Sequence, residues 1–214
     1  MTDGLSTGVD KVVRLVRSEL ADPADWTTPD GYPGDIEAAI LDAVFSSQAV
    51  YSDDENKGPR GVVTRWRARP PDGKQLQDYE RYPEALSHIL ENAAKQNGRK
   101  KSEIAAEIAH RFADGQPALT TVEALKANTP DAKRRWTAAH GAGPATFHYF
   151  CLLLGLPDVK ADTWVIRFVA RALGADESDL TASQVRALAI AAADELEVNP
   201  IYLDHAIWRH ESGR

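Results

Sequence analysis

The stretch from residue 136 to residue 173 holds two patterns of residues that are suited to chemistry. A glycine turn, Gly141-Ala142-Gly143, runs directly into Pro144, a residue that fits the first position of a helix because its missing N–H is not needed there. Glycines allow a ligand to approach the backbone closely, and the free N–H groups at a helix start bind phosphate. Asp162 follows as a single carboxylate. Together these residues predict an anion-binding turn and a candidate acid–base group.

Apolar residues on both sides of the turn repeat with helical spacing. From Pro144 the repeat i, i+3, i+4 and i+7 is filled by apolar residues: Phe147, Phe150, Cys151 and Leu154. A second apolar stripe follows Asp162: Trp164, Val165, Phe168, Val169, Ala172 and Leu173. We therefore expect the turn to join two helices and Asp162 to be the N-cap of a third helix or the neighbour of that cap.

Two patterns occur in order in this region, G-x-G-x-x-T and D-T-x-x-x-R. The residues that fill them are Gly141, Gly143 and Thr146, and then Asp162, Thr163 and Arg167. Upstream, residues 43–49 read A-V-F-S-S-Q-A and include Gln48. As an ordered set these segments resemble the helix-hairpin-helix (HhH-GPD) DNA glycosylases of the endonuclease III type. The similarity covers roughly residues 36 to 174.

This resemblance implies an all-α fold with two helical lobes. The central lobe would span residues 36–158, with the helix-hairpin-helix near 134–155, and the second lobe would combine residues 1–35 with 159–214. The resemblance also implies a flipped base in a groove between the lobes, Asp162 as the catalytic carboxylate and Gln48 as the side chain that enters the duplex.

Two departures from the family pattern narrow the expected chemistry. Members that also cleave the sugar–phosphate backbone carry a lysine just before the hairpin threonine, whereas this chain has Ala145. Without that amine only a monofunctional, water-dependent mechanism of the family fits. An iron–sulfur cluster needs several cysteines, and Cys151 is the single cysteine. We expect no cofactor and no metal, and we expect Cys151 in the core.

Further residues are expected to contact DNA or to line the base pocket. The expected DNA contacts besides Gln48 are the hairpin residues Gly141, Ala142, Gly143 and Thr146 and the basic run Arg99, Lys100 and Lys101. Aromatic walls for the flipped base are expected from Tyr51, Trp136 and Trp164. The register of Trp164 also fits a core position, and each basic run also fits a solvated helix face.

Composition bounds the class of protein. The chain has 214 residues and a formal net charge of −7, which argues against strong nonspecific DNA binding. No apolar run approaches the roughly 20 residues that cross a bilayer, and the beginning of the chain does not resemble a signal peptide. With one cysteine, these features predict a cytoplasmic protein without a membrane partner, and we expect a monomer.

The sequence leaves function hypotheses of different classes open. The first is a monofunctional DNA glycosylase of base excision repair that acts on double-stranded DNA with a damaged or modified base. The second is a catalytically silent helix-hairpin-helix DNA-binding module, and the third is a helical protein-interaction domain. The presence of both Asp162 and Gln48 favours the enzyme, because a helical core requires neither. The sequence does not select the target base.

Overall fold

The computed structural model describes residues 2–28, 30–49, 54, 56–70 and 73–213. Helices dominate these residues, and their strand content is a single short antiparallel pair, β1 (Lys95–Gln96) with β2 (Arg99–Lys100). The expected all-α class is therefore confirmed. No helix among the described residues has both the length and the apolar character needed to cross a membrane.

The chain forms two compact units. The central unit is residues Tyr32–Leu154, and the terminal unit combines Met1–Gly31 with Gly155–Arg214. The sequence predicts the corresponding boundaries at residues 36 and 158.

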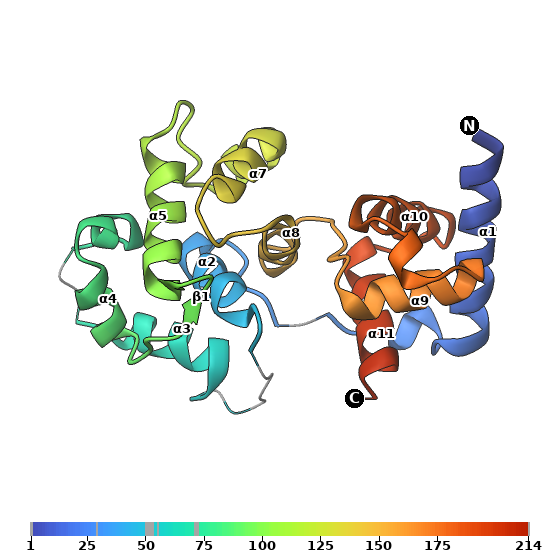
Figure 1. Ribbon diagram of the computed structural model, residues 1–214, viewed down its shortest axis with the longest axis horizontal. Helices are drawn as coiled ribbons and strands as arrows, with labels where there is room; N and C mark the ends of the chain where they lie inside the picture. The colour runs from blue at the N-terminus through green and yellow to red at the C-terminus, as the bar shows by residue number, and fades with distance from the viewer. Residues whose placement is uncertain (1, 29, 50–53, 55, 71–72, 214) are drawn as a thin grey trace. The chain divides into compact units, whose positions relative to one another are not determined.

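The central unit is built around the apolar helix α2, which packs against α3, α5 and α8 (Figure 1). Its elements in chain order are α2 (Ile36–Ser46), α3 (Gly58–Ala68), η2 (Leu76–Arg81), α4 (Pro83–Ile89), β1, β2, α5 (Lys101–Asp114), α6 (Val122–Ala127), α7 (Thr129–Thr137) and α8 (Pro144–Leu153). Asp35 caps α2 by accepting a hydrogen bond from the Ala38 N–H at 3.0 Å. Because α2 is buried along nearly its whole length, it fixes where its carboxyl end, and hence Gln48, emerges.

An aromatic cluster joins α5, α7 and α8 inside the central unit. The rings of Trp136 and Phe150 lie 4.8 Å apart between centroids, and Phe112 and Phe147 contact the same pair. Cys151 is buried, as expected. This cluster holds together the two helices that flank the glycine turn.

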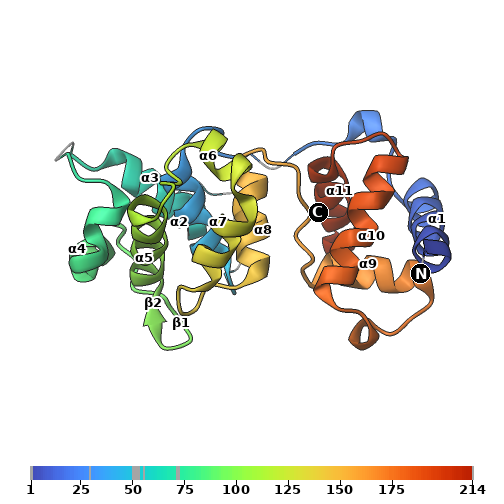
Figure 2. The same cartoon turned by 90° about the horizontal axis from the view of Figure 1, so that it is seen from above.

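The terminal unit packs α1 against α9 and α10, with α11 against α9 and α10 (Figure 2). Its elements are α1 (Thr2–Glu19), η1 (Pro23–Asp25), α9 (Thr163–Leu173), η3 (Glu177–Asp179), α10 (Ala182–Glu195) and α11 (Pro200–Ser212). A capping box of Thr181 and Gln184 begins α10, and Asn199 caps α11, whose first residue is a proline. Gly174 ends α9 in the left-handed conformation, with φ 71°.

Candidate functional site

The glycine turn joins α7 to α8, as the sequence predicts. The Ala139 N–H donates to the Trp136 carbonyl at 3.1 Å, and the Ala142 N–H donates to the Ala139 carbonyl at 3.0 Å. Gly141 has φ 98°, a conformation that favours glycine. The turn is therefore a compact hairpin whose backbone conformation requires a glycine at residue 141.

Thr146 closes this hairpin from the first turn of α8. Its Oγ1 accepts a hydrogen bond from the Gly143 N–H at 3.2 Å and donates to the Gly143 carbonyl at 2.8 Å. The same oxygen accepts the indole N–H of Trp136 at 3.0 Å. Thr146 thus acts within the protein, as a tie between α7, the turn and α8.

The β1–β2 pair and α5 support the hairpin from one side. Gln96 Nε2 donates to the Gly141 carbonyl at 2.7 Å, and Arg99 donates to the His140 carbonyl at 3.3 Å. A Cβ at Gly141 would lie 2.7 Å from Cδ1 of Ile104. Gly143 differs, because a Cβ there would meet no atom within 4 Å and its φ is −116°. Neighbouring residues thus pack against the hairpin at Gly141, whereas there is free space for a side chain at Gly143.

Arg99 and Lys100 are both engaged with acidic side chains. Arg99 donates to Glu107 at 2.7 Å and lies 3.5 Å from Glu103, and the hydrogen bond that it donates to Glu107 raises the pKa of Arg99. Lys100 Nζ contacts the carboxylate of Glu84 at 2.6 Å. Their positive charges are therefore largely compensated within the protein.

Lys101 differs from the expectation of a surface DNA contact. Its side chain is buried, and its Nζ donates to the carbonyls of Phe45 at 3.0 Å and Ser47 at 2.5 Å. Burial lowers its pKa. The ammonium group binds the free carbonyls at the carboxyl end of α2, where a cation is stabilised by the helix dipole. Lys101 is thus a structural residue.

Gln48 lies directly beyond this lysine-bound helix end. Its side chain is exposed, its backbone is left-handed with φ 57°, and the Ala49 N–H donates to the Ser46 carbonyl at 3.2 Å. Gln48, the side chain expected to enter the duplex, therefore lies on a turn, and Lys101 binds the carbonyl groups that precede this turn. Tyr51, a candidate wall of the base pocket, lies outside the described residues.

The two other aromatic candidates have different surroundings. Trp136 is completely buried in the aromatic cluster. It is therefore a core residue and does not line an open pocket, contrary to the prediction. Trp164 is only partly buried, and the guanidinium group of Arg167 lies 5.0 Å from its ring centroid. Trp164 follows Asp162 within the first turn of α9.

Asp162 is the N-cap of α9, as expected. Its Oδ1 accepts hydrogen bonds from the backbone N–H groups of Trp164 at 3.0 Å and Val165 at 3.3 Å. Its Oδ2 lies 3.9 Å from Nζ of Lys160, and a quarter of its side chain is exposed, 25%. One oxygen thus fixes the helix start, and the carboxylate as a whole still reaches the surface.

Sequence reasoning missed a second carboxylate beside Asp162. Asp204, on α11, accepts the backbone N–H of Lys160 at 2.8 Å. Asp204 is half-buried, and desolvation by the surrounding protein, followed by the negative charge of Asp162, raises its pKa to about 8. No local motif marks Asp204, because its partner is 44 residues away in the sequence.

The segment before Asp162 is held at its other end as well. Asp158 is buried, accepts the Val159 N–H at 2.7 Å and pairs with Arg186 of α10 at 2.6 Å. The Asp162 N–H donates to the Lys160 carbonyl at 2.7 Å, which makes a tight turn just ahead of α9. Residues 158–162 therefore form a rigid segment that carries the candidate catalytic carboxylate.

A buried carboxyl group also lies within the central unit. Asp42 of α2 accepts hydrogen bonds from the Tyr32 hydroxyl at 2.7 Å and from Ser46 at 2.8 Å. Burial raises the pKa of Asp42, and burial together with the charge of Asp42 raises that of Tyr32. This group ties the start of the central unit to α2.

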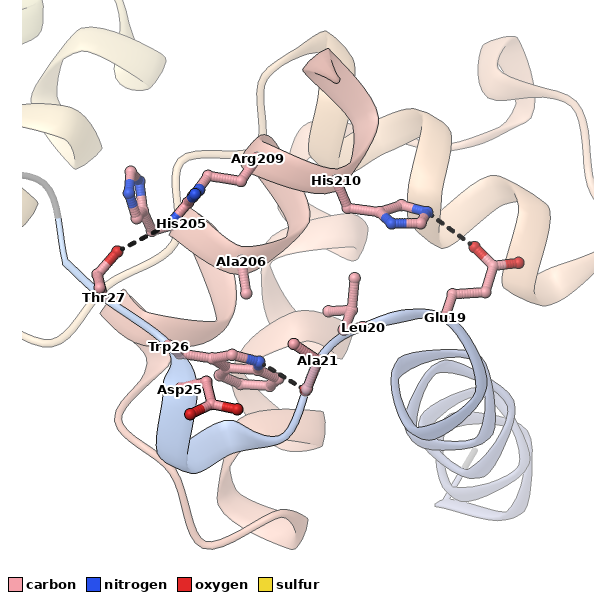
Figure 3. A pocket seen from close by; sticks show the side chains of 10 residues that line it. All are labelled: Glu19, Leu20, Ala21, Asp25, Trp26, Thr27, His205, Ala206, Arg209 and His210. Carbon is pink, nitrogen blue, oxygen red and sulfur yellow. Dashed lines mark hydrogen bonds and ion pairs between the residues drawn. The ribbon is translucent and has the colours of Figure 1, made fainter. Parts of the chain in front are cut away.

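The terminal unit contains a hollow of about 340 Å³ between the end of α1, η1 and α11 (Figure 3). Trp26 lines it, with its indole N–H donating to the Ala21 carbonyl at 2.8 Å, and Arg209 lies 3.4 Å from the Thr27 hydroxyl. Burial, followed by the charge of Arg209, lowers the pKa of His205. The hollow is small, and polar groups rim it.

One group of described residues has the composition of a metal site. Ligand atoms of Glu19, His210 and Glu211 lie within 4.8 Å of one another. Arg171 occupies this place with its guanidinium group, at 2.8 Å from Glu19 and 2.6 Å from Glu211. Because a cation already bridges the two carboxylates, the group is better described as an ion-pair network.

Comparison with known families decides where this chain belongs. A family model described as "Domain of unknown function (DUF8548)" matches residues 10–212. The chain belongs to this family. The DUF8548 match includes α9, α11 and the hairpin, so all the candidate residues described above lie inside the family domain. No curated protein matches the chain.

Proposed function

We propose that this DUF8548 protein is a monofunctional DNA glycosylase of the helix-hairpin-helix type. In this proposal it hydrolyses the N-glycosidic bond of a flipped damaged or modified base in double-stranded DNA, as a monomer and without a cofactor. The observation that carries the proposal is the placement of Asp162, which is fixed by two backbone N–H groups and remains partly exposed.

The chemistry of base release suits such a carboxylate. Cleavage of an N-glycosidic bond builds positive charge on the sugar, and a fixed carboxylate stabilises that charge without reorganising. The backbone N–H groups at the start of α9 hold this carboxylate in place, and the positive end of the helix dipole lies beside it. The same group is able to orient or deprotonate the attacking water.

The hairpin supports a contact with the DNA backbone. Gly143 faces open space at the start of α8, where Pro144 leaves no N–H and the next N–H groups point out of the helix end. Phosphate fits such a place, since the helix dipole adds to the N–H donors. Gly141 and Thr146 would keep the hairpin in shape.

Ala145 supports hydrolysis over strand cleavage. Its side chain is exposed in the first turn of α8, at the position where bifunctional members of the resembled family carry a lysine. A methyl group supplies no nucleophile for a Schiff base. The proposed product is therefore a free base together with an intact strand that carries an abasic site.

A catalytically silent DNA-binding module is the second candidate. It is favoured by the pairing of Arg99 and Lys100 with glutamates, which leaves less positive charge for phosphates than the sequence suggests. A silent module would still bind through the hairpin and would not need Asp162 to be exposed.

The test is a screen for base release. Purified protein is incubated with duplexes that each carry one alkylated, deaminated, oxidised or mismatched base, and heat or alkali then reveals abasic sites as strand breaks. Breaks that depend on Asp162 are the expected result. If DNA is bound and no base is released from any duplex, the silent module replaces the enzyme.

A further inference from the structure

Asp204 has a defined structural task next to Asp162. Its Oδ1 accepts the Lys160 N–H at 2.8 Å, and the Lys160 carbonyl in turn accepts the Asp162 N–H at 2.7 Å. The backbone of Lys160 thus connects Asp204 with Asp162 through two hydrogen bonds. A shift of Asp204 would move Lys160 and, through it, the start of α9.

The charges around Asp204 disfavour its ionised form. The groups that face it are Asp162, Lys160 and Asp158 from the segment before α9, and Asp158 is paired with Arg186 of α10. On its own helix His205 follows directly, with a lowered pKa. Lys160 is shared, since its Nζ also lies 3.9 Å from Asp162. Two neighbouring carboxylates with one shared lysine keep a proton on one of them.

We propose that Asp204 is a positioning residue that holds a proton beside Asp162, so that Asp162 is the one ionised carboxylate presented to the substrate. As a catalytic device this inference rests on the proposed function, whereas the pairing itself does not. In its neutral form Asp204 keeps the bond to Lys160 while adding no negative charge next to DNA phosphates. Ionisation of Asp204 adds a second negative charge next to Asp162 and repels the substrate.

Two substitutions separate positioning from proton holding. Asparagine keeps an oxygen for the Lys160 N–H and stays neutral at every pH, so Asp204→Asn imitates the protonated acid. Alanine removes the acceptor, so Asp204→Ala frees the segment that carries Asp162. We expect Asp204→Asn to release base within about twofold of the wild-type rate at pH 6.5, and Asp204→Ala to lose at least about tenfold.

The pH dependence of base release distinguishes proton holding from a purely structural role of Asp204, because a structural role would not change this dependence. The wild type is expected to lose activity as the pH rises through about 8, and Asp204→Asn is expected to lack this decline. The measurement is single-turnover base release between pH 6 and 9.5. A shared decline in both proteins, or a tenfold loss in Asp204→Asn at pH 6.5, would overturn the proposal.

A direct titration keeps this inference distinct from the proposed function. Carboxyl carbon NMR on the full chain follows Asp204 between pH 3 and 10, and the Lys160 amide shift follows the same transition. We expect both to report a transition near 8 that is absent in Asp204→Asn. A transition near 4 overturns the Asp204 inference and leaves the glycosylase proposal standing. A transition near 8 without base release by the wild type overturns the glycosylase proposal and supports the pairing alone.

Discussion

Trp136 donates its indole N–H to Oγ1 of Thr146 at 3.0 Å, across the turn between α7 and α8. The same oxygen also accepts the Gly143 N–H, so the last turn of α7 and the first turn of α8 share one hydrogen-bonding centre. Loss of the hydroxyl group would leave the completely buried Trp136 without its partner. A threonine at this position of the G-x-G-x-x-T pattern therefore stabilises the hairpin itself, whether or not DNA is bound.

The two glycines of the hairpin make a matched pair of variants. Gly143→Leu should fold normally, because its Cβ meets open space and its φ suits any residue, yet it should weaken binding to every duplex by about tenfold, or ~1.4 kcal/mol. Lesion preference should not change, since phosphate contacts carry no base information. Fluorescence anisotropy with matched intact and lesion-bearing duplexes measures both quantities.

Gly141→Ala is the structural counterpart. The left-handed φ of 98° and the contact with Ile104 should lower the free energy of unfolding by roughly 1–3 kcal/mol. Urea denaturation measures this change. If Gly143→Leu binds DNA as tightly as the wild type while Gly141→Ala is destabilised, the hairpin is only a structural turn.

The buried lysine at the end of α2 is expected to matter for stability. Lys101→Met keeps the apolar stem but leaves the carbonyls of Phe45 and Ser47 without their donor, which should cost about 1–3 kcal/mol of unfolding free energy. Lys100→Met is the control, because its ion pair with the exposed Glu84 should contribute less than about 1 kcal/mol. Equal losses in the two variants would contradict the structural role of Lys101.

Local signals in the sequence were sufficient for much of the fold. The cap at Asp162 is predictable because a cap and the N–H groups that it binds lie within three residues of each other, and the caps at Thr181 and Asn199 have the same local character. The apolar spacing around residues 147–154 likewise reports a helix face. The Asn97-Gly98 turn between β1 and β2, with φ values of 51° and 83°, was overlooked although this pair is a strong hairpin signal.

Roles that depend on distant partners could not be predicted in this way. Lys101 belongs to a basic run and is buried because it meets the end of α2, 54 residues earlier at Ser47. Asp204 is an isolated acid in the sequence and becomes a neighbour of Asp162 only when α11 packs against α9. Residue type and spacing do not encode such pairings, because tertiary packing selects the partner.

Stability should depend on pH through Asp204. Its folded pKa of about 8 lies above the ordinary value of 3.8, so the unfolded chain releases this proton near pH 4 and the folded chain keeps it to about pH 8. The contribution to stability is therefore complete below about pH 4 and is lost progressively as the pH rises to about 8. Asp42, whose pKa burial also raises, acts in the same direction.

The difference between two proteins isolates the Asp204 part of this effect. Denaturant unfolding of the wild type and of Asp204→Asn at intervals between pH 4 and 8.5 should give a steeper decline in the wild type, while the Asp42 contribution cancels. Parallel curves would show that Asp204 ionises normally in the folded protein.

The absence of an amine at Ala145 predicts the products. The wild type should leave an intact abasic strand, and borohydride should trap no covalent complex, because Ala145 has no nucleophile. Denaturing gel electrophoresis of borohydride-treated reactions makes this visible. A trapped complex that disappears in Lys160→Met would instead identify Lys160, whose Nζ lies 3.9 Å from Asp162, as the nucleophile.

Asp162→Asn separates the enzyme from a DNA-binding module. Asparagine retains an oxygen that accepts the N–H groups of Trp164 and Val165, so the cap and the fold should survive. Base release should fall by orders of magnitude, since a neutral amide neither stabilises a cationic sugar nor accepts a proton from water. DNA affinity should stay equal or improve, because one negative charge near phosphates is removed.

Asp158→Asn is the matched control for that experiment. Asp158 is a buried acid of the same segment, and its partner is Arg186, so its loss should lower stability and should reduce turnover far less than the loss of the Asp162 carboxylate. Single-turnover base release and anisotropy binding are measured on both variants at the same fraction folded. A catalytic carboxylate is the conclusion only if Asp162→Asn loses turnover far beyond Asp158→Asn. Equal effects would leave Asp162 as a helix cap of α9 and favour the binding module.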